Sequence, residues 1–542
     1  MTIFIYVIFY NLAFFYGRGL LLLIEKLFKI NLIDKKISGI KLLSFSPLIF
    51  LFFVGNVSFI LNFLISNKNV VYFFLPIIFF NLLKTRNQNT DFNYFINFIL
   101  IPLFLGFSSL DIGMHFDAGL YHLNFQNWLR ESNLVIGIAN IYSPYGWSSL
   151  NEYISSLFWI ENNFILLHFI QLIFLTQLFS FLLNNIKSNN IFLKYPSLFV
   201  LVMGVLDNFG ITGGRNGFFS IQSIGKFDTS FGVIFFIFSL LILDQIFKNN
   251  YSKSDLIFLS FLLVFCVQMK LTGLICGLLY LIYIYKYQKI NKVSYLKILN
   301  ISKFPIILSF FWITKNLIQS GCLFYTIEFS CFSNLSWYET GYSTILRLET
   351  SEFNNAFLFN QDTALWFQSW YSVEINRTHI LNLAISLLII YIMKKVFFTS
   401  SKINKTVTSI CIFFILVNFF IWIVGSPDPR FAHGLFVLIV ASLGFNVTGI
   451  KYPLFIKYNK NILLLIFFIC LILTPRINSY SSFVNQPTIL NVVEVPNVDY
   501  KQSDYWGEIP IDNECWVNID CNKFNKNLVK KKISIFQAFM SK

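Results

Sequence analysis

Charged side chains are scarce in this chain of 542 residues. Asp, Glu, Lys and Arg make up 12% of it, whereas soluble globular proteins contain about 25%. Hydrophobic residues make up 56%, and the mean hydropathy is +0.65. This composition excludes an ordinary soluble domain and predicts a polytopic membrane protein.

The chain also lacks the common motifs of nucleotide-driven and hydrolytic enzymes. It has no Walker loop, no dinucleotide-binding glycine motif, no HEXXH zinc motif and no GXSXG nucleophile elbow. These absences remove most of the support for coupling to ATP and for the common hydrolase chemistries.

Long uncharged runs are what the chain contains instead. Each of them is near or above the roughly 20 residues that a helix needs to cross about 30 Å of hydrocarbon. We therefore expect an all-α membrane protein with about 12 to 14 transmembrane helices. The clearest runs are residues 42–67, 92–110, 163–186 and 406–427.

Lys and Arg gather in short segments, which the positive-inside rule places in the cytoplasm. The intervening Lys-poor segments then lie outside. This alternation requires residues 256–285 to cross twice, as two short helices broken near residues 268–273. The net charge of +15 is explained by cytoplasmic loops on anionic lipid, so membrane lipids and not nucleic acid are the expected partners. The basic segments are residues 26–41, 84–86, 187–194, 248–253, 286–303, 394–405 and 451–460.

These assignments divide the chain into five parts. The tail is placed outside, although its lysines would also suit the cytoplasm. The parts are N-terminal transmembrane helices at 1–91, a transmembrane core at 92–320 with a first outer loop at 111–162, an outer (periplasmic) insert at 321–378, C-terminal transmembrane helices at 379–475 and the tail at 476–542.

The eight cysteines form two groups under this topology. Cys322 with Cys331, and Cys515 with Cys521, lie in outer segments, where an oxidising compartment allows two local disulfides. The other four lie in spans, where a thiol acts as a small hydrophobic group. They are Cys266, Cys276, Cys411 and Cys470.

The segment "LDIGMHFDAGLYHLNFQNWLRESN" concentrates polar groups directly after an uncharged span. Helical spacing puts Asp117 and Tyr121 on one face, with Asp111 about two turns earlier and His122 adjacent. Such a carboxylate could take a proton from a hydroxyl, or hold a divalent metal against a pyrophosphate. The same groups also suit helix capping and interfacial solvation, with Trp128 as an aromatic anchor.

More polar groups fall on the same predicted side. Glu152 lies in "IANIYSPYGWSSLNEYISSLFW", which predicts amphipathic helices on the membrane surface. The stretch "GITGGRNGFFSIQSIGKFDTSFG" adds Arg215, Lys226 and Asp228. Asp228 begins a span, so it also suits a simple capping role.

Two cations stand at membrane depth. Lys270, in "QMKLTG", lies in the turn between the two short helices, and Arg430, in "GSPDPRFAHG", lies between two hydrophobic spans. Ionisable groups there usually face a cavity or a partner, and the phosphate of a lipid-linked substrate would satisfy both. The alternatives are snorkelling for Lys270 and an ion pair with Asp428 for Arg430.

Together these features resemble the GT-C superfamily of integral-membrane glycosyltransferases. The resemblance rests on an acidic first outer loop, amphipathic helices after it, the Asp in "KFDTSFG", a Lys-Xaa-Thr-Gly hairpin and a terminal outer segment. More narrowly, "DAGLYH", residues 140–151, "PDPRF" and the Trp-Gly and Cys-Trp pairs of the tail are similar to a bacterial membrane-protein family found near surface-polysaccharide genes. The resemblance covers most of residues 92–521.

The resemblance implies a GT-C-like bundle and a polyprenyl-phosphate or polyprenyl-pyrophosphate sugar donor bound from the outer face. It makes Asp117 the expected base and Asp111 the second candidate, and the two could hold Mg or Mn. The departure from the superfamily is that these acids are six positions apart and follow three extra predicted spans. The other expected site residues are His122 in catalysis, Lys270, Arg430 and Arg215 on the donor phosphate, and Tyr121, Asp228, Glu152 and Trp128 on substrate.

The expected function is transfer of a sugar or glycan from the lipid carrier to a glycan, lipid or protein acceptor. The expected place is the bacterial inner membrane, with the active site facing the periplasm or exterior. A surface-polysaccharide polymerase is the alternative among enzymes. A flippase or transporter of a lipid-linked saccharide is the alternative from another class, and it predicts essential charges near mid-membrane and on both faces.

Overall fold

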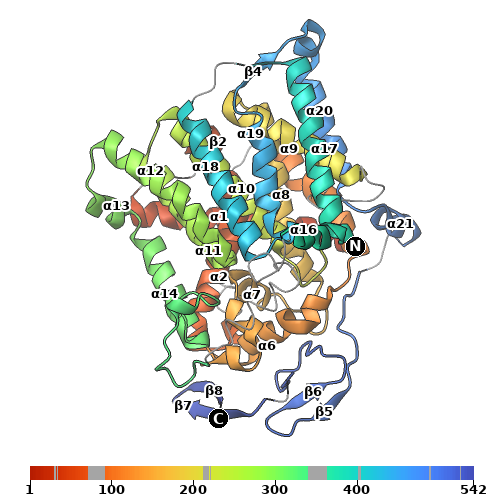
Figure 1. The fold of residues 1–542 in the computed structure, drawn as a ribbon. Helices are drawn as coiled ribbons and strands as arrows, with labels where there is room; N and C mark the ends of the chain where they lie inside the picture. Colours follow the sequence, from red (N-terminus) through yellow and green to blue (C-terminus); the bar gives the residue numbers. More distant parts are fainter. Residues whose placement is uncertain are drawn as a thin grey trace.

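The computed structural model is a bundle of long helices with shorter elements and hairpins at one end (Figure 1). It describes residues 1–29, 32, 35–70, 92–210, 219, 221–339, 363–400, 405–486, 490–524 and 526–541. Helices dominate this part of the chain, as expected. Its strands form antiparallel pairs: β1 (Lys36–Ile37) with β2 (Ile40–Lys41), β3 (Phe398–Ser400) with β4 (Val447–Ile450), β5 (Tyr500–Gln502) with β6 (Glu508–Pro510), and β7 (Leu528–Ile533) with β8 (Phe536–Ser541).

Seven of the described helices are long and apolar enough to cross a membrane, and they indicate a membrane protein. Two bent helix pairs raise the count to nine at most, so the expected count of about 12 to 14 is not confirmed. The seven are α1 (Thr2–Phe28), α2 (Ser46–Asn62) with the preceding η1 (Leu42–Phe45), α8 (Ile165–Lys187), α9 (Ile191–Phe209), α10 (Asp228–Lys248), α17 (Glu374–Phe397) and α18 (Lys405–Gly425). The bent pairs are α13 (Tyr295–Ile301) with α14 (Lys303–Ser320), and α20 (Pro453–Leu473) with α21 (Ile477–Asn485).

The apolar run at residues 256–285 is broken in its middle, as predicted. α11 (Lys253–Met269) ends just before Lys270, η7 (Leu271–Ile275) forms the turn, and α12 (Cys276–Asn291) follows. The far ends of the two helices meet, because Asn291 Nδ2 donates to the carbonyl of Tyr251 at 3.4 Å. Lys270 therefore lies at the turn of an antiparallel helical hairpin.

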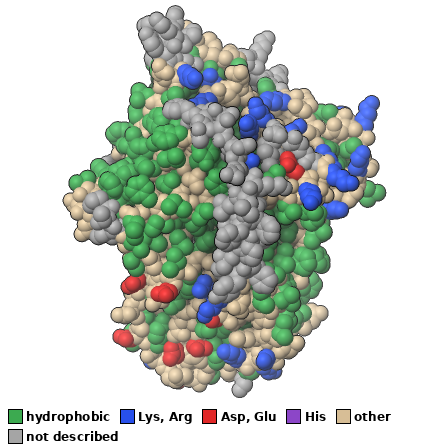
Figure 2. Space-filling view, turned by 180° about the vertical axis from the view of Figure 1, so that it is seen from behind, with side chains coloured by type: hydrophobic (Ala, Val, Ile, Leu, Met, Phe, Trp, Pro, Cys, Tyr) green, Lys and Arg blue, Asp and Glu red, His purple; other side chains and the backbone are tan. Residues whose placement is uncertain are grey.

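The described basic segments gather at one end of the bundle, and residues 84–86 lie outside the described residues. α1 and α10 both end there, and α11 and α13 both begin there, each next to lysines. In Figure 2 most Lys and Arg side chains lie over the upper half of the molecule, and hydrophobic side chains cover the middle. Most Asp and Glu side chains lie near the lower end, together with a smaller number of Lys and Arg side chains. We call the two ends the Lys-rich end and the Lys-poor end.

The first outer loop and the tail together cover the Lys-poor end (Figure 1). The backbone N–H of Trp516 donates to the carbonyl of Gly119 at 2.9 Å, and that of Ile136 donates to Gln537 at 2.9 Å. The Trp128 and Phe539 rings pack with centroids 5.5 Å apart. Helices of this end and of its connections are α4 (Phe92–Phe95), η2 (Ile96–Leu100), α5 (Ile101–Gly106), η3 (Phe107–Leu110), η4 (Ala118–His122), α6 (Leu123–Glu131), η5 (Ile138–Asn140), η6 (Ser143–Trp147), α7 (Leu150–Ser155), η8 (Glu328–Ser330), α16 (Thr363–Ser372), η10 (Pro429–Ala432) and α19 (His433–Ser442).

The stretch at residues 138–159 does not form amphipathic helices on the membrane surface, which corrects the sequence-based expectation. It folds into the short helices η6 and α7, and all six residues of α7 are buried. The physical reason is the cover that α2, α6 and α11 place over α7, so that its apolar face meets protein instead of lipid.

Both disulfides that the cysteine pattern predicts are present, Cys322–Cys331 and Cys515–Cys521. The four other cysteines are free thiols and buried, as expected of small hydrophobic groups in helices.

Removing the tail disulfide should loosen the tail without unfolding the bundle. Replacing Cys515 and Cys521 with Ala opens a loop of seven residues, which should destabilise the tail by about 2 kcal/mol. Limited proteolysis of the purified protein should then cut the tail faster. The matched control replaces Cys322 and Cys331 with Ala and should leave the rate of tail cleavage unchanged, whereas equal rates in all three proteins would contradict the prediction.

Candidate functional site

Arg430 joins two carboxylates at the Lys-poor end of the bundle. It lies in η10, between α18 and α19. Its Nε is 2.8 Å from Oδ2 of Asp428, and its Nη1 is 3.5 Å from Oδ2 of Asp117. The Asp428 side chain also accepts from the backbone N–H of Arg430 at 2.9 Å, which fixes the turn. Arg430, which is expected to bind the donor phosphate, is thus paired with Asp117, the expected base.

A second ion pair lies beside the first. Lys270 Nζ is 2.8 Å from Oδ1 of Asp228, and it lies 3.6 Å from the centroid of the Phe431 ring. The guanidinium carbon of Arg430 lies 4.9 Å from the same centroid. Because one aromatic ring contacts both cations, the two ion pairs form one cluster.

His122 and Glu152 form a buried polar chain next to this cluster. The Glu152 carboxylate is hydrogen-bonded to Nδ1 of His122, and its other oxygen accepts from Gln126 at 2.7 Å. Trp159 Nε1 donates in turn to Gln126 at 3.0 Å. The His122 ring packs against Phe227, the residue before α10, with centroids 5.1 Å apart. The first outer loop is thereby held against the start of α10.

Small residues allow the two helices that carry the ion pairs to approach closely. A Cβ on Gly232 of α10 would lie 3.0 Å from the backbone nitrogen of Gly434 on α19. Close helix crossings in membranes use such residues. Because Asp228 lies one turn before Gly232, and Arg430 one turn before Gly434, this crossing brings the two charged residues together.

The loop that carries Asp117 is fixed to the segment before α10. The backbone N–H of His115 donates to the carbonyl of Ile224 at 2.8 Å, and that of Ile224 donates to Gly113 at 3.1 Å. Residues 118–122 then form one turn of π-helix, a distortion that is frequent at functional sites.

The Asp117 carboxylate is held in its ionised form. Burial opposes its ionisation, but a hydrogen bond with His115 and electrostatic attraction from His122, His115 and Arg430 outweigh burial, so the pKa of Asp117 lies below its usual value. His115 Nδ1 is 3.2 Å from Oδ2 and 3.1 Å from the backbone nitrogen of Asp117. The imidazole can therefore donate to the carboxylate or accept from the backbone, depending on its tautomer.

The pKa values of two neighbouring groups, Tyr121 and Asp428, are raised instead of lowered. Burial and the carboxylates of Asp117, Asp228 and Glu152 raise the pKa of the Tyr121 phenol well above its usual value, so it stays a neutral hydrogen-bond donor. Burial also raises the pKa of Asp428, despite the opposing charge of Arg430. Asp117 is thus the more strongly ionised partner of Arg430.

Lys226 adds a third cation. Its pKa is lowered by burial and by the charge of Arg430, while Asp117, Asp228 and Asp428 act in the opposite direction. These couplings place Lys226 among the same carboxylates. We call Asp117, Tyr121, Lys226, Asp228, Lys270, Asp428 and Arg430 the charged cluster.

Comparison with known proteins yields a family. A family model described as "Domain of unknown function (DUF8201)" matches residues 1–437. The chain belongs to the DUF8201 family. The matched DUF8201 region contains the whole charged cluster and ends within α19, before the tail. No curated protein and no solved structure matches the chain.

Some expected site residues of this DUF8201 protein lie apart from the charged cluster. Asp111 accepts a hydrogen bond from Ser479 Oγ of α21, and no contact in the described residues joins it to Asp117. Trp128 is buried in the packing between loop and tail, against Trp506 and Phe539. Arg215 lies outside the described residues.

The donor set for a divalent metal was tested against the same geometry. Within the described ranges, no group of three or more His, Cys, Asp or Glu side chains is arranged to hold a metal ion. Oδ2 of Asp117 faces the His115 imidazole and the Arg430 guanidinium. These residues do not fit a metal site as they stand. Dependence on Mg or Mn stays a prediction.

Sequence patterns carry weaker signals for three further titratable residues of this DUF8201 protein. His115 lies two positions before Asp117, a spacing that could have singled it out. His433 packs beside the cluster, with Nδ1 3.4 Å from Oγ1 of Thr229. Lys315 of α14 is fully buried, hydrogen-bonded to Ser148 and 3.4 Å from the Trp312 ring centroid. A single Lys in an apolar run was the available signal for it.

Gly225 should be required for the position of Asp117. Its φ is +96°, and a Cβ there would lie 2.6 to 2.8 Å from atoms of Ala118, including its backbone. Gly225→Ala should therefore push the Asp117 turn away from Arg430 and lower activity on the order of 100-fold, at a normal membrane level. The measurement is the rate at which each variant, expressed at equal levels in cells that lack the protein, clears the accumulated lipid-linked intermediate. Gly113→Ala is the control, since nothing lies within 4 Å of its added Cβ; equal activity of the two variants would contradict the prediction.

Proposed function

We propose that the chain is a GT-C-type membrane glycosyltransferase. It transfers a sugar or glycan from a polyprenyl-phosphate or polyprenyl-pyrophosphate carrier to a glycan, lipid or protein acceptor. The observation that carries the proposal is the pairing of the Asp117 carboxylate with Arg430, beside the Asp228–Lys270 pair. A base and two to three cations within one cluster are what transfer from a phosphate leaving group requires.

The chemistry follows from the charges of the cluster. Asp117 takes the proton from the acceptor hydroxyl, whose oxygen forms the new bond to the anomeric carbon. The bond from that carbon to the phosphate oxygen breaks, and the polyprenyl phosphate or pyrophosphate leaves with its electron pair. Arg430, Lys270 and Lys226 compensate the charge that develops on the leaving group.

Binding of the donor would itself activate the base. Arg430 lowers the pKa of Asp117, and a base with a low pKa is a weak proton acceptor. A donor phosphate competes with Asp117 for the guanidinium of Arg430 because both are oxyanions. When Arg430 turns to the phosphate, the pKa of Asp117 rises and the carboxylate becomes a better base. Tyr121, which stays protonated, supplies a neutral donor for a substrate oxygen.

The finer topology belongs to the same proposal. We place the Lys-poor end, with the charged cluster, at the outer face of the bacterial inner membrane, in a GT-C-like bundle of about 12 to 14 spans. The support is the gathering of lysines at the opposite end, which the positive-inside rule assigns to the cytoplasm.

The test is an analysis of lipid-linked glycans in cells that lack the protein. We expect an undecorated lipid-linked intermediate to accumulate on the outer face of the inner membrane, accessible to an impermeant label, and to disappear on complementation. Accumulation of single repeat units with loss of long chains would instead identify a polymerase. Accumulation of the lipid-linked intermediate on the cytoplasmic face would contradict the enzyme proposal and favour a flippase or transporter.

A further inference from the structure

A hollow with a basic lining lies at the Lys-rich end of the bundle. Its volume is about 340 Å³, and its lining includes the exposed residues Lys253, Lys297 and Lys303, together with the apolar Leu27 and Phe304. Lys253 begins α11 and Lys270 follows its end, and a helix of 17 residues is about 25 Å long. The basic hollow is therefore separate from the charged cluster.

The three lysines leave positive charge in this hollow. No ion pair joins any of them to a carboxylate within the described part of the chain. Lys253 and Lys303 are also the first residues of α11 and α14, and the N-terminal ends of helices carry partial positive charge. The hollow is suited to an anion, and its apolar residues to an anion that carries hydrocarbon.

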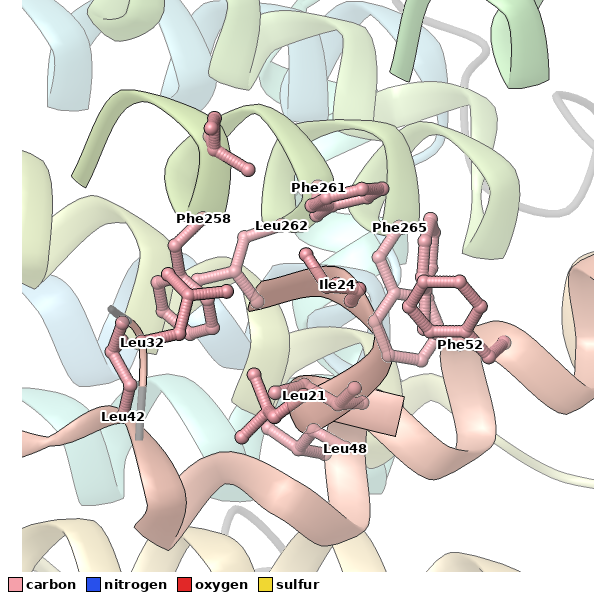
Figure 3. Close-up of a pocket in the computed structure, with 13 residues that line it drawn as sticks. Leu21, Ile24, Leu32, Leu42, Leu48, Phe52, Phe258, Phe261, Leu262 and Phe265 are labelled. Atoms are coloured by element: carbon pink, nitrogen blue, oxygen red, sulfur yellow. The ribbon is translucent and has the colours of Figure 1, made fainter. Parts of the chain in front are cut away.

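A narrow apolar hollow lies next to the basic one, between α1, α2 and α11 (Figure 3). Thirteen residues line it, all of them Leu, Ile or Phe. In Figure 3 the side chains of Leu21 and Ile24 point from α1 toward those of Phe258 and Phe261 on α11. This lining offers hydrocarbon contact and no hydrogen-bonding side chain.

The two hollows lie along one seam. On α11, Lys253 of the basic hollow precedes Ile257 and Phe261 of the apolar one at intervals of four, which puts the three on one helix face. On α1, Leu27 follows Ile24 at an interval of three. From Lys253 to Phe265 the seam rises about 18 Å, close to half of the roughly 30 Å hydrocarbon thickness.

We propose that this seam binds an anionic glycerophospholipid. Its phosphate lies among Lys253, Lys297 and Lys303, and one acyl chain begins at the apolar hollow, whose volume of about 30 Å³ admits only a small part of the chain. Basic pockets between transmembrane helices select anionic headgroups, because each lysine near the surface contributes attraction that zwitterionic lipids do not match. The site is independent of the proposed function, since none of its residues belongs to the charged cluster.

The test uses the purified full-length protein, with lipid binding counted by native mass spectrometry. Dioleoyl phosphatidylglycerol is titrated against dioleoyl phosphatidylcholine. The variant replaces Lys253, Lys297 and Lys303 with Gln, and the matched control replaces the lysines Lys289, Lys292 and Lys395, which do not line the hollow, with Gln. We expect the wild type and the control to bind phosphatidylglycerol alike, and the variant to bind it on the order of 100-fold more weakly, roughly fivefold for each lysine.

Four outcomes would overturn the proposal. Equal binding by the variant and the control would show that these lysines do not form the site. Equal binding of phosphatidylcholine would remove the charge selectivity. Full competition by inorganic phosphate or by dihexanoyl phosphatidylglycerol would assign the hollow to a free phosphate and leave the apolar seam without a role. Preferred binding of a polyprenyl phosphate would identify a different lipid class as the occupant.

Discussion

Replacing Asp117 with Asn should stop glycosyl transfer while leaving the protein in the membrane at its normal level. The amide has nearly the shape of the carboxylate but cannot accept the proton of the acceptor hydroxyl, and loss of a general base lowers rates by roughly 10²- to 10⁴-fold. In cells, the variant should fail to clear the lipid-linked intermediate. Membrane abundance of variant and wild type, measured on the same samples, separates loss of chemistry from loss of folding.

Asp111→Asn is the matched control for this experiment. Asp111 lies in the same loop, six residues earlier, but its carboxylate accepts a hydrogen bond from Ser479 of α21. We expect Asp111→Asn to clear the intermediate. If Asp111→Asn fails and Asp117→Asn succeeds, the base has been assigned to the wrong carboxylate. Full activity of both variants would exclude both carboxylates from catalysis.

Replacing Arg430 with Gln should cause a loss of similar size and should also change the pH dependence. Arg430 is one of the charges that hold the pKa of Asp117 below its usual value. Removing it raises that pKa, so Asp117 becomes protonated at a higher pH. Since kcat/KM reports the ionisation of the free enzyme, the acid limb of its pH profile should move to higher pH in the variant.

The wild-type profile provides an internal check on the same argument. The acid limb of kcat/KM should lie below the ordinary aspartate pKa of about 3.9, because Asp117 is ionised in the free enzyme. The acid limb of kcat should lie at higher pH, since donor phosphate draws Arg430 away in the complex. Coincident acid limbs would contradict activation of the base by the donor.

Two further variants separate the roles of Arg430. Arg430→Lys keeps the charge but loses the planar guanidinium group, whose Nη1 and Nε contact Asp117 and Asp428 together. It should therefore keep only part of the wild-type activity. Arg377→Gln removes an exposed Arg near the start of α17 and should leave the pH profile unchanged. If Arg430→Gln keeps both its activity and its acid limb, Arg430 has no part in the reaction.

The main features of the bundle could be predicted from the sequence because they depend on local preference for lipid or water. The uncharged runs at residues 42–67 and 163–186 correspond closely to α2 and α8, and the break near Lys270 separates α11 from α12. The prediction is wrong at residues 138–159, where amphipathic composition predicts a membrane-surface position. Composition shows that a face is apolar but not whether lipid or protein covers it, and here protein covers α7.

A helical membrane protein, two groups of cysteines and a set of charges on one side can all be predicted from the amino-acid sequence. These follow from the solvation of each segment and from short-range spacing. The tertiary structure alone decided which charges pair. Asp117 meets Arg430 across 313 positions, because Gly232 and Gly434 let α10 and α19 approach and because backbone hydrogen bonds fix residues 113 and 115 to Ile224. Asp228 meets Lys270, which lies at the turn between α11 and α12. Asp111, which has the same charge and lies in the same loop, turns instead to Ser479. Such choices depend on the packing of distant helices, which no local pattern encodes.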